Sequence, residues 1–253
     1  MIYVCIPVHE EASTVGVLLW KIRKVMGEFG RDYRIVVHDD ASGDDTIEVL
    51  QRYRRSLPLT VLRSSERQGY GRSVERLLRH VADVSPYPKR DCAVVMQGDF
   101  TENPEDMVSL VKVFEGGADI VAGHENGDAT QAVAAPDGVR WARRLSGIFL
   151  RRLLRTAPVS DPLSGMRAYR VIVLKKAFRD LPEEQFLTTS DGWAANVELL
   201  GCLVPHARRV AEAPLTLRYD LRQRPSRFKA WPTFVSLFKL RRSVWSEAPP
   251  EAV

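Results

Sequence analysis

The chain has 253 residues, a formal net charge of +5 and 45% hydrophobic residues, enough apolar sequence for the core of one large α/β domain. No apolar run approaches the roughly 20 residues of a membrane span, and the N-terminal residues read directly as a strand, so we expect neither a transmembrane helix nor a signal peptide. The three cysteines lie in apolar segments without metal-like spacing, which is typical of buried thiols in a reducing compartment. We therefore expect a cytoplasmic protein rather than a disulfide-rich secreted one.

Strands and helices are predicted to alternate through the first half of the chain. Strands are expected at 2–8, 33–38, 59–63, 92–96 and 118–122. The helices between them are expected from Ser13 or Thr14 to about 29, from Asp44 or Asp45 toward 55, at 70–81 and at 104–114. This order predicts a doubly wound, mostly parallel sheet of the Rossmann type, with right-handed crossovers.

The pattern changes after residue 122. The expected elements are a Gly-rich loop at 123–138, a basic helix at 139–154, a strand at 166–169, helices at 171–178 and 191–203, a strand at 208–219, a basic loop at 222–229, a last helix at 231–245 and a Pro-rich tail. No linker divides the chain. We predict one domain over 1–230, with a nucleotide-binding half at 1–122 and an acceptor half at 123–230, followed by an amphipathic helix and tail at 231–253.

Acidic residues follow several of the predicted strands. Asp99 stands where a buried strand opens into a loop, and Asp39 and Asp40 end the second strand. Because loops after parallel strands gather at one edge of a sheet, we expect these three carboxylates to converge in one crevice. Converging carboxylates are costly unless they hydrogen-bond a ligand or hold a cation. The alternative for Asp99 is a cap for the helix that follows.

Four segments carry a resemblance to a known family. They are IPVHEE at 6–11, VVHDDASGDDT at 36–46, QGDFTENPE at 97–105 and DPLSGMRAYR at 161–170. In this order they resemble the signatures of the GT-A fold glycosyltransferases of family 2. Within that family the chain is most similar to the dolichyl- or polyprenyl-phosphate sugar transferase branch, which includes dolichol-phosphate mannosyltransferases.

The resemblance implies roles for the matched positions. It places the donor nucleotide against Pro7, His9, Glu11, Asp39, Asp40, Gln97 and Asp99. It assigns Mg²⁺ or Mn²⁺ to Asp99, where the cation neutralises the diphosphate leaving group. It brings Arg167 close to the donor phosphates or the acceptor. It also implies a cationic loop that closes over the phosphates and the acceptor, formed here by Arg222, Arg224, Ser226, Arg227 and Lys229.

Two departures bear on the metal and the phosphates. Gln97 stands where the family has the first acid of its Asp-x-Asp pair, and an amide oxygen is a weaker ligand for a hard cation than a carboxylate. The family's common Gly-Ser-Arg after the fifth strand is replaced by residues 123–125, Gly-His-Glu, so a phosphate-binding arginine is missing.

Asp191 is the candidate catalytic base, because other branches of the family place a base at the end of a Thr-Glu-Asp motif here. It would deprotonate an acceptor hydroxyl for attack on the anomeric carbon. The alternative is an N-cap for the helix that begins at Gly192. Glu198 is a second candidate base, and a phosphate acceptor would need none. The last helix is expected to pack on the core, with a place at a membrane surface as the alternative.

The leading function is an inverting hexosyltransferase that moves a sugar from a UDP- or GDP-linked donor to a polyprenyl phosphate or a small-molecule, natural-product acceptor. The alternatives are a non-catalytic nucleotide-sugar-binding protein and, last, a nucleotidyltransferase, which would need a Gly-rich basic loop after the first strand. We expect no nucleic-acid partner, because the basic clusters at 140–152 and 218–229 accompany no such signature. A lipid-phosphate acceptor would imply peripheral contact with a membrane.

Overall fold

The computed structural model describes residues 1–125, 159–181, 187, 192–216 and 236–237, and the account below is confined to them. Seven strands form one sheet in the order β3-β2-β1-β4-β6-β5-β7. The strands are β1 (Ile2–Val8), β2 (Tyr33–Asp39), β3 (Leu59–Arg63), β4 (Cys92–Val95), β5 (Ile120–Glu125), β6 (Arg167–Arg170) and β7 (Val210–Leu215). Their positions agree with the predicted strands to within a few residues.

The sheet is parallel except at one strand. The first four strands pair in parallel, as do β5 and β7. β6 runs antiparallel between β4 and β5, with Val95 and Ala122 both opposite Arg167. The prediction of a mostly parallel sheet is therefore confirmed, with β6 as the antiparallel strand among the described residues. The break falls where the regular βα alternation ends, so the chain no longer returns through a right-handed crossover.

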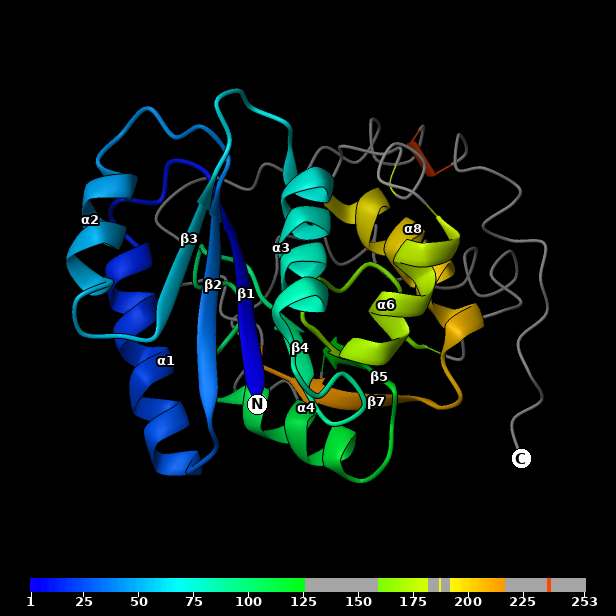
Figure 1. Ribbon diagram of the computed structural model, residues 1–253. Helices are drawn as coiled ribbons and strands as arrows, with labels where there is room; N and C mark the ends of the chain where they lie inside the picture. The colour runs from blue at the N-terminus through cyan, green and yellow to red at the C-terminus, as the bar shows by residue number, and fades with distance from the viewer. Residues whose placement is uncertain (126–158, 182–186, 188–191, 217–235, 238–253) are drawn as a thin grey trace.

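Helices cover both faces of the sheet. Alternate residues of β1 enter different clusters, with Val4 and Ile6 in one and Tyr3 and Cys5 in the other, because successive strand side chains point to opposite faces. The first cluster packs under α1 (Val15–Phe29), α2 (Thr46–Tyr53) and α4 (Asp106–Glu115). The second packs under α3 (Tyr70–Val84), α6 (Val171–Asp180) and α8 (Gly192–Leu203), which lie side by side in Figure 1.

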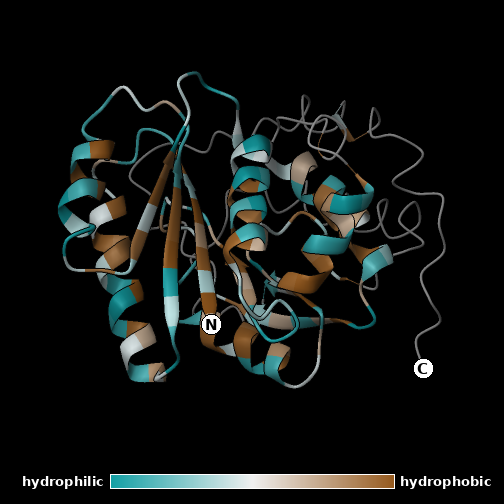
Figure 2. Ribbon diagram, in the orientation of Figure 1, coloured by the Kyte–Doolittle hydropathy of each residue, from teal (hydrophilic) through white to brown (hydrophobic). Residues whose placement is uncertain are grey.

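The apolar residues that form these clusters are visible along the central strands in Figure 2. All three cysteines are free and buried, as expected. Burial raises the pKa of the Cys92 thiol to about 12, which keeps it protonated and unreactive. His38, in β2, is fully buried and its Nε2 lies 3.0 Å from Oγ of Ser64, so it has a structural role.

The second half of the chain contains further described elements. α8 begins at Gly192 and is followed by a short 3₁₀ helix, Val204–His206. None of the helices in the described ranges is long and apolar enough to cross a membrane. The predicted elements at 139–154, 222–229 and 231–245 lie wholly or mainly outside the described residues.

Candidate active site

Three loops at the carboxyl edge of the sheet follow β1, β2 and β4. Each turns through a non-glycine residue in the left-handed region: Glu10 at φ 55°, Ala41 at φ 54° and Phe100 at φ 63°. Such a conformation costs of order 1–3 kcal/mol and concentrates at functional sites. The residues just before these turns are His9, Asp40 and Asp99, three of the predicted site residues.

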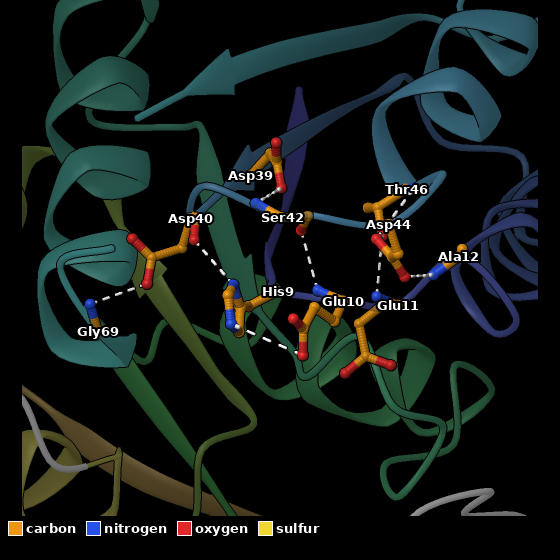
Figure 3. Close-up of polar contacts among 10 residues, drawn as sticks. All are labelled: His9, Glu10, Glu11, Ala12, Asp39, Asp40, Ser42, Asp44, Thr46 and Gly69. Carbon is orange, nitrogen blue, oxygen red and sulfur yellow. Dashed lines mark hydrogen bonds and ion pairs between the residues drawn. The ribbon is translucent and has the colours of Figure 1, made fainter. Parts of the chain in front are cut away.

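Side chains that follow β2 accept hydrogen bonds from the backbone of the loop after β1 (Figure 3). Backbone N–H groups of Glu10 and Glu11 donate to the hydroxyls of Ser42 and Thr46, each at 2.9 Å, and the N–H of Ala12 donates to the Asp44 carboxylate at 3.1 Å. Serine, threonine and aspartate in the second loop thus satisfy the backbone of the first. Glu11 itself is buried and accepts a hydrogen bond from the Thr14 hydroxyl at 2.8 Å.

His9 has a defined tautomer in this arrangement. Its Nδ1 lies 2.8 Å from the backbone oxygen of Asp40, and because a carbonyl only accepts, Nδ1 must carry the proton. Its Nε2 lies 3.9 Å from the Glu10 carboxylate, a weak pairing that exists only when the ring is charged. Pro7, the other predicted site residue on this segment, is buried in β1 opposite His38.

Asp39 and Asp40 are both buried but have different partners. Oδ1 of Asp39 accepts the N–H of Ser42 at 3.2 Å, and its Oδ2 lies 3.3 Å from Nε of Arg63. Both carboxylate oxygens of Asp40 accept backbone N–H groups, from Gln68 and Gly69, each at 2.8 Å. Asp40 therefore fixes the entry to α3, whereas Asp39 retains an oxygen without a hydrogen bond to any described residue.

The loop after β4 carries Gln97 and Asp99. Asp99 is 5% exposed and accepts the N–H of Thr101 at 3.1 Å. α4 begins only at Asp106, and the turn before it is capped by Asn103, so Asp99 does not directly precede the helix. The backbone N–H of Gln97 donates to the buried Glu102 carboxylate at 2.7 Å.

The loop after β4 fits a divalent cation only if a bound ligand supplies further oxygen atoms. No group of three or more His, Cys, Asp or Glu side chains within the described ranges is arranged to hold a metal ion. Asp99 offers one carboxylate next to the neutral Gln97. Mg²⁺ is commonly held by one or two carboxylates together with substrate phosphates, and Asp99 matches that pattern when a diphosphate supplies the remaining oxygens.

Arg167, which the resemblance brings close to the donor phosphates or the acceptor, has two backbone partners in the structure. Its side chain is fully buried on β6, and Nη1 and Nη2 donate to the backbone oxygens of Asn196 and Pro162, each at 2.6 Å. The structure thus favours a role for Arg167 in holding the loop at 159–165 and α8 in place. The predicted place of Arg167 near the donor phosphates or the acceptor stays a prediction.

The remaining predicted residues are only partly described. Asp191 and the cationic loop residues Arg222, Arg224, Ser226, Arg227 and Lys229 lie outside the described residues. Glu198, the second candidate base, is on α8 and 1% exposed, a poor position for contact with an acceptor. Sequence reasoning gave no role to Tyr70, Glu102 or Asn196. Tyr70, Glu102 and Gln97 all approach Gly165, and the Tyr70 hydroxyl donates to Asn196. A buried polar side chain has no periodic signal that distinguishes it from a surface one.

Comparisons with known proteins agree with this geometry. The family model described as "Glycosyl transferase family 2" matches residues 3–178. The chain is similar to the dolichol-phosphate mannosyltransferase of Pyrococcus furiosus, with 27% identity over 179 residues, 68% of this chain and 47% of that protein. It is also similar to the undecaprenyl-phosphate 4-deoxy-4-formamido-L-arabinose transferase of Edwardsiella ictaluri, with 25% identity over 177 residues, 68% and 50% of the two chains. The chain thus spans about half the length of these relatives.

Solved structures show the same fold. Glucosyl-3-phosphoglycerate synthase of Mycobacterium tuberculosis, crystallised with Mn²⁺, UDP and glucosyl-3-phosphoglycerate, gives a TM-score of 0.64 at 19% identity, over 100% of this chain and 81% of that one. This likeness confirms the predicted α/β GT-A fold. Because the family model covers most of the chain, the predicted family is confirmed as well: the chain belongs to glycosyl transferase family 2.

Proposed function

We propose that this protein is a glycosyltransferase that moves a sugar, with inversion, from a UDP- or GDP-linked donor to an acceptor. The observation that carries the proposal is the convergence of His9, Asp39 and Asp99 at one edge of the sheet, on loops that turn through strained residues. Two of these three are buried acids, and buried acids cost free energy that ligand binding can recover.

The donor nucleoside would bind against the loops of β1 and β2. Uracil and guanine both present a ring N–H, and Oδ2 of Asp39, which accepts no hydrogen bond from a described residue, is an acceptor suited to such a group. His9, whose Nδ1 is held by the carbonyl of Asp40, presents its other ring nitrogen or its face. Asp40 contributes indirectly, by fixing the backbone of Gln68 and Gly69 beside the site.

The diphosphate would lie by the loop after β4. Asp99 is the residue that would hold Mg²⁺ or Mn²⁺, which supplies positive charge to the departing diphosphate. Gln97, with its neutral side chain, is proposed to contact the donor rather than to add charge. The arginines and lysine at 222–229 are proposed to share in neutralising the phosphates and in binding the acceptor.

The acceptor is proposed to carry a phosphate. The two curated relatives are named for dolichol phosphate and undecaprenyl phosphate, and the structural neighbour was crystallised with a phosphoglycerate product. An ionised phosphate attacks without a base, whereas a hydroxyl acceptor needs one, and Asp191 is the proposed base in that case. A lipid acceptor implies contact with a membrane surface, and a soluble acceptor does not.

A panel of nucleoside diphosphates tests the proposal. UDP, GDP, ADP and CDP are each added with and without Mn²⁺, and the melting temperature is measured. A true ligand raises it by an amount set by the ligand excess over its dissociation constant. The corresponding nucleotide sugar is then incubated with protein, and release of nucleoside diphosphate is followed. Binding without release, with either a lipid phosphate or a phosphoglycerate as acceptor, would support the alternative of a non-catalytic binding protein. If no nucleotide shifted the melting temperature, both the glycosyltransferase and the non-catalytic binding protein would be refuted.

A further inference from the structure

We propose that Tyr70 and Asn196 are positioning residues, which fix the first turn of α8 against the loops of the donor side. Nothing in the family signature assigns these two residues. The inference rests on the proposed function for its catalytic consequence, but the structural coupling itself does not require that function. Four connected sets of contacts support it.

The first contacts tie α3 to the donor side. Both oxygens of the Asp40 carboxylate accept N–H groups of Gln68 and Gly69, and Gly69 has a positive φ of 89° that glycine adopts without strain. The next residue, Tyr70, is the first residue of α3. The place of Tyr70 is therefore set by a carboxylate of the β2 loop.

The second contacts run from Tyr70 to α8. The Tyr70 hydroxyl donates to Oδ1 of Asn196 at 3.1 Å. Its ring lies against the first residue of α8, since a Cβ added at Gly192 would make an ordinary van der Waals contact with it at 3.5 Å. Burial, and secondarily the charge of Glu102, raises the pKa of the Tyr70 hydroxyl far above its ordinary value. The hydroxyl stays protonated and can serve as the donor at any working pH.

In the third set of contacts, Asn196 binds the loop at 159–165 and the side chain of Arg167. Its Nδ2 donates to the backbone oxygen of Leu163 at 3.0 Å, and its own backbone oxygen accepts from Nη1 of Arg167 at 2.6 Å. The other end of the same guanidinium binds the oxygen of Pro162. Asn196 is 3% exposed, so these bonds are protected from water. The side chains of Asn196 and Arg167 thus join the loop at 159–165 to α8.

The fourth contacts reach the loop after β4. A Cβ added at Gly165 would lie 3.1 Å from the Tyr70 hydroxyl, 3.2 Å from Nε2 of Gln97 and 3.2 Å from Oε1 of Glu102. Polar groups from α3 and from the loop after β4 therefore meet at the backbone of Gly165. The close approach of these groups leaves little room for a side chain at residue 165, which explains the glycine although its φ is not positive.

These contacts place α8 relative to the whole donor side. Asp191, the proposed base, directly precedes α8 in the sequence. A shift of about 1 Å in a catalytic group can cost about 100-fold in rate, so the orientation of the first turn of α8 matters even though Tyr70 and Asn196 touch no substrate. Removing the Tyr70 hydroxyl should loosen this turn and slow the transfer step without weakening donor binding.

The test uses Tyr70→Phe, with Tyr53→Phe as the matched control. Tyr53 is a partly buried tyrosine of α2, on the other face of the sheet. Hydrogen exchange of the α8 amides is measured in the substrate-free protein, and kcat and KM are measured with the donor found by the nucleotide panel. For Tyr70→Phe we expect faster exchange of the α8 amides that donate to carbonyls of its first turn. We also expect a kcat lowered by about 10- to 100-fold and a donor KM within about twofold of wild type. For Tyr53→Phe we expect neither change.

A second variant keeps the proposal open to refutation. Asn196→Leu removes the same hydrogen bond from its other end, so Tyr70→Phe combined with Asn196→Leu should cost little more kcat than Asn196→Leu alone. Unchanged exchange in α8 for Tyr70→Phe would overturn the proposal. The proposal would also be overturned if Tyr70→Phe lowered the melting temperature and the nucleotide affinity along with kcat, because that result indicates general destabilisation. Failure of the nucleotide panel would refute the proposed function, and the exchange result would still decide the coupling.

Discussion

Nε of Arg63 lies 3.3 Å from Oδ2 of Asp39, so that an exposed guanidinium is paired with a fully buried carboxylate. Arg63 keeps 55% of its side chain in solvent, and the arrangement does not meet the geometry of a hydrogen bond, since Oδ2 has no such partner in the described part of the chain. An ion pair with one solvated member stabilises a fold little. A carboxylate held in this way is better explained by a ligand that it binds.

The first prediction concerns Asp39 and separates its effect on stability from its effect on nucleotide binding. Asp39→Asn keeps the shape and the acceptor for the N–H of Ser42 but removes the buried charge. We expect the melting temperature without ligand to be unchanged or raised. We expect the affinity for the best nucleoside diphosphate to fall by about 10- to 100-fold, since a hydrogen bond to a charged group contributes about 1.5–3 kcal/mol. Titration calorimetry measures the affinity and a thermal melt the stability.

Arg63→Met is the control for the loss of Asp39's partner. It removes the cation but leaves the carboxylate, so the substrate-free protein should become less stable. If Asp39→Asn bound the nucleotide as tightly as wild type, Asp39 would be a structural residue and the nucleoside would have to bind elsewhere.

Much of this site follows from sequence because it depends on topology. β3 spans the residues that its apolar run predicts, and the convergence of the loops after β1, β2 and β4 follows from parallel strands alone. The antiparallel insertion of β6 has no such signal, because a strand's direction depends on neighbours far along the chain. The sequence did not predict the partners of Asp40 either, because Gln68 and Gly69 bind it through backbone N–H groups, which almost every residue carries.

The second prediction concerns the metal at Asp99. Asp99→Asn retains an oxygen for the N–H of Thr101, so the loop should keep its shape. We expect Mn²⁺ to add little or nothing to the thermal shift given by the nucleotide, and EDTA to have the same effect on wild type as the substitution. Glu105→Gln, which loses an exposed pair with Lys21, should respond to Mn²⁺ as wild type does. A metal response that survived in Asp99→Asn would place the cation at other residues.

The third prediction concerns the close approach of the loop after β4 to β1. A Cβ added at Gly98 would lie 2.9 Å from a methyl group of Val8 and 3.3 Å from the backbone oxygen of Pro7. Gly98→Ala should therefore push the Asp99 loop away from the sheet. We expect a loss of about 1–3 kcal/mol in the free energy of unfolding, the usual effect of overpacking, and a weaker nucleotide response with Mn²⁺.

Gly43→Ala is the matched control, because nothing lies within 4 Å of the added Cβ and its φ is not positive. Chemical denaturation should show wild-type or slightly higher stability for this variant, as expected when glycine is replaced at a compatible position. Equal stability of Gly98→Ala and Gly43→Ala would show that the loop after β4 adjusts freely.

The fourth prediction concerns pH and Asp106, at the start of α4. Burial raises the pKa of this carboxyl from 3.8 to about 6, although the N–H of Thr216, which it accepts at 2.6 Å, acts in the opposite direction and the charge of Glu105 adds to the rise. Because the folded pKa exceeds the unfolded one, its contribution to stability is full below pH 3.8 and is lost as the pH rises through about 6. Above that pH the folded protein must hold a partly buried charge.

Asp106→Asn keeps an acceptor for Thr216 and removes this titration. We expect wild type to lose stability relative to Asp106→Asn between pH 4 and pH 6 and the difference to stay constant at higher pH, as measured by urea denaturation at each pH. Glu105→Gln provides the comparison of opposite sign, since the Lys21 hydrogen bond lowers the pKa of Glu105 and its contribution is present at high pH and lost on acidification. If the two variants had the same pH dependence, burial of Asp106 would not be the cause. Thr216 follows β7, and the predicted cationic loop at 222–229 comes next in the sequence. Measuring acceptor binding over the same pH range therefore asks whether it depends on the contact between Asp106 and Thr216.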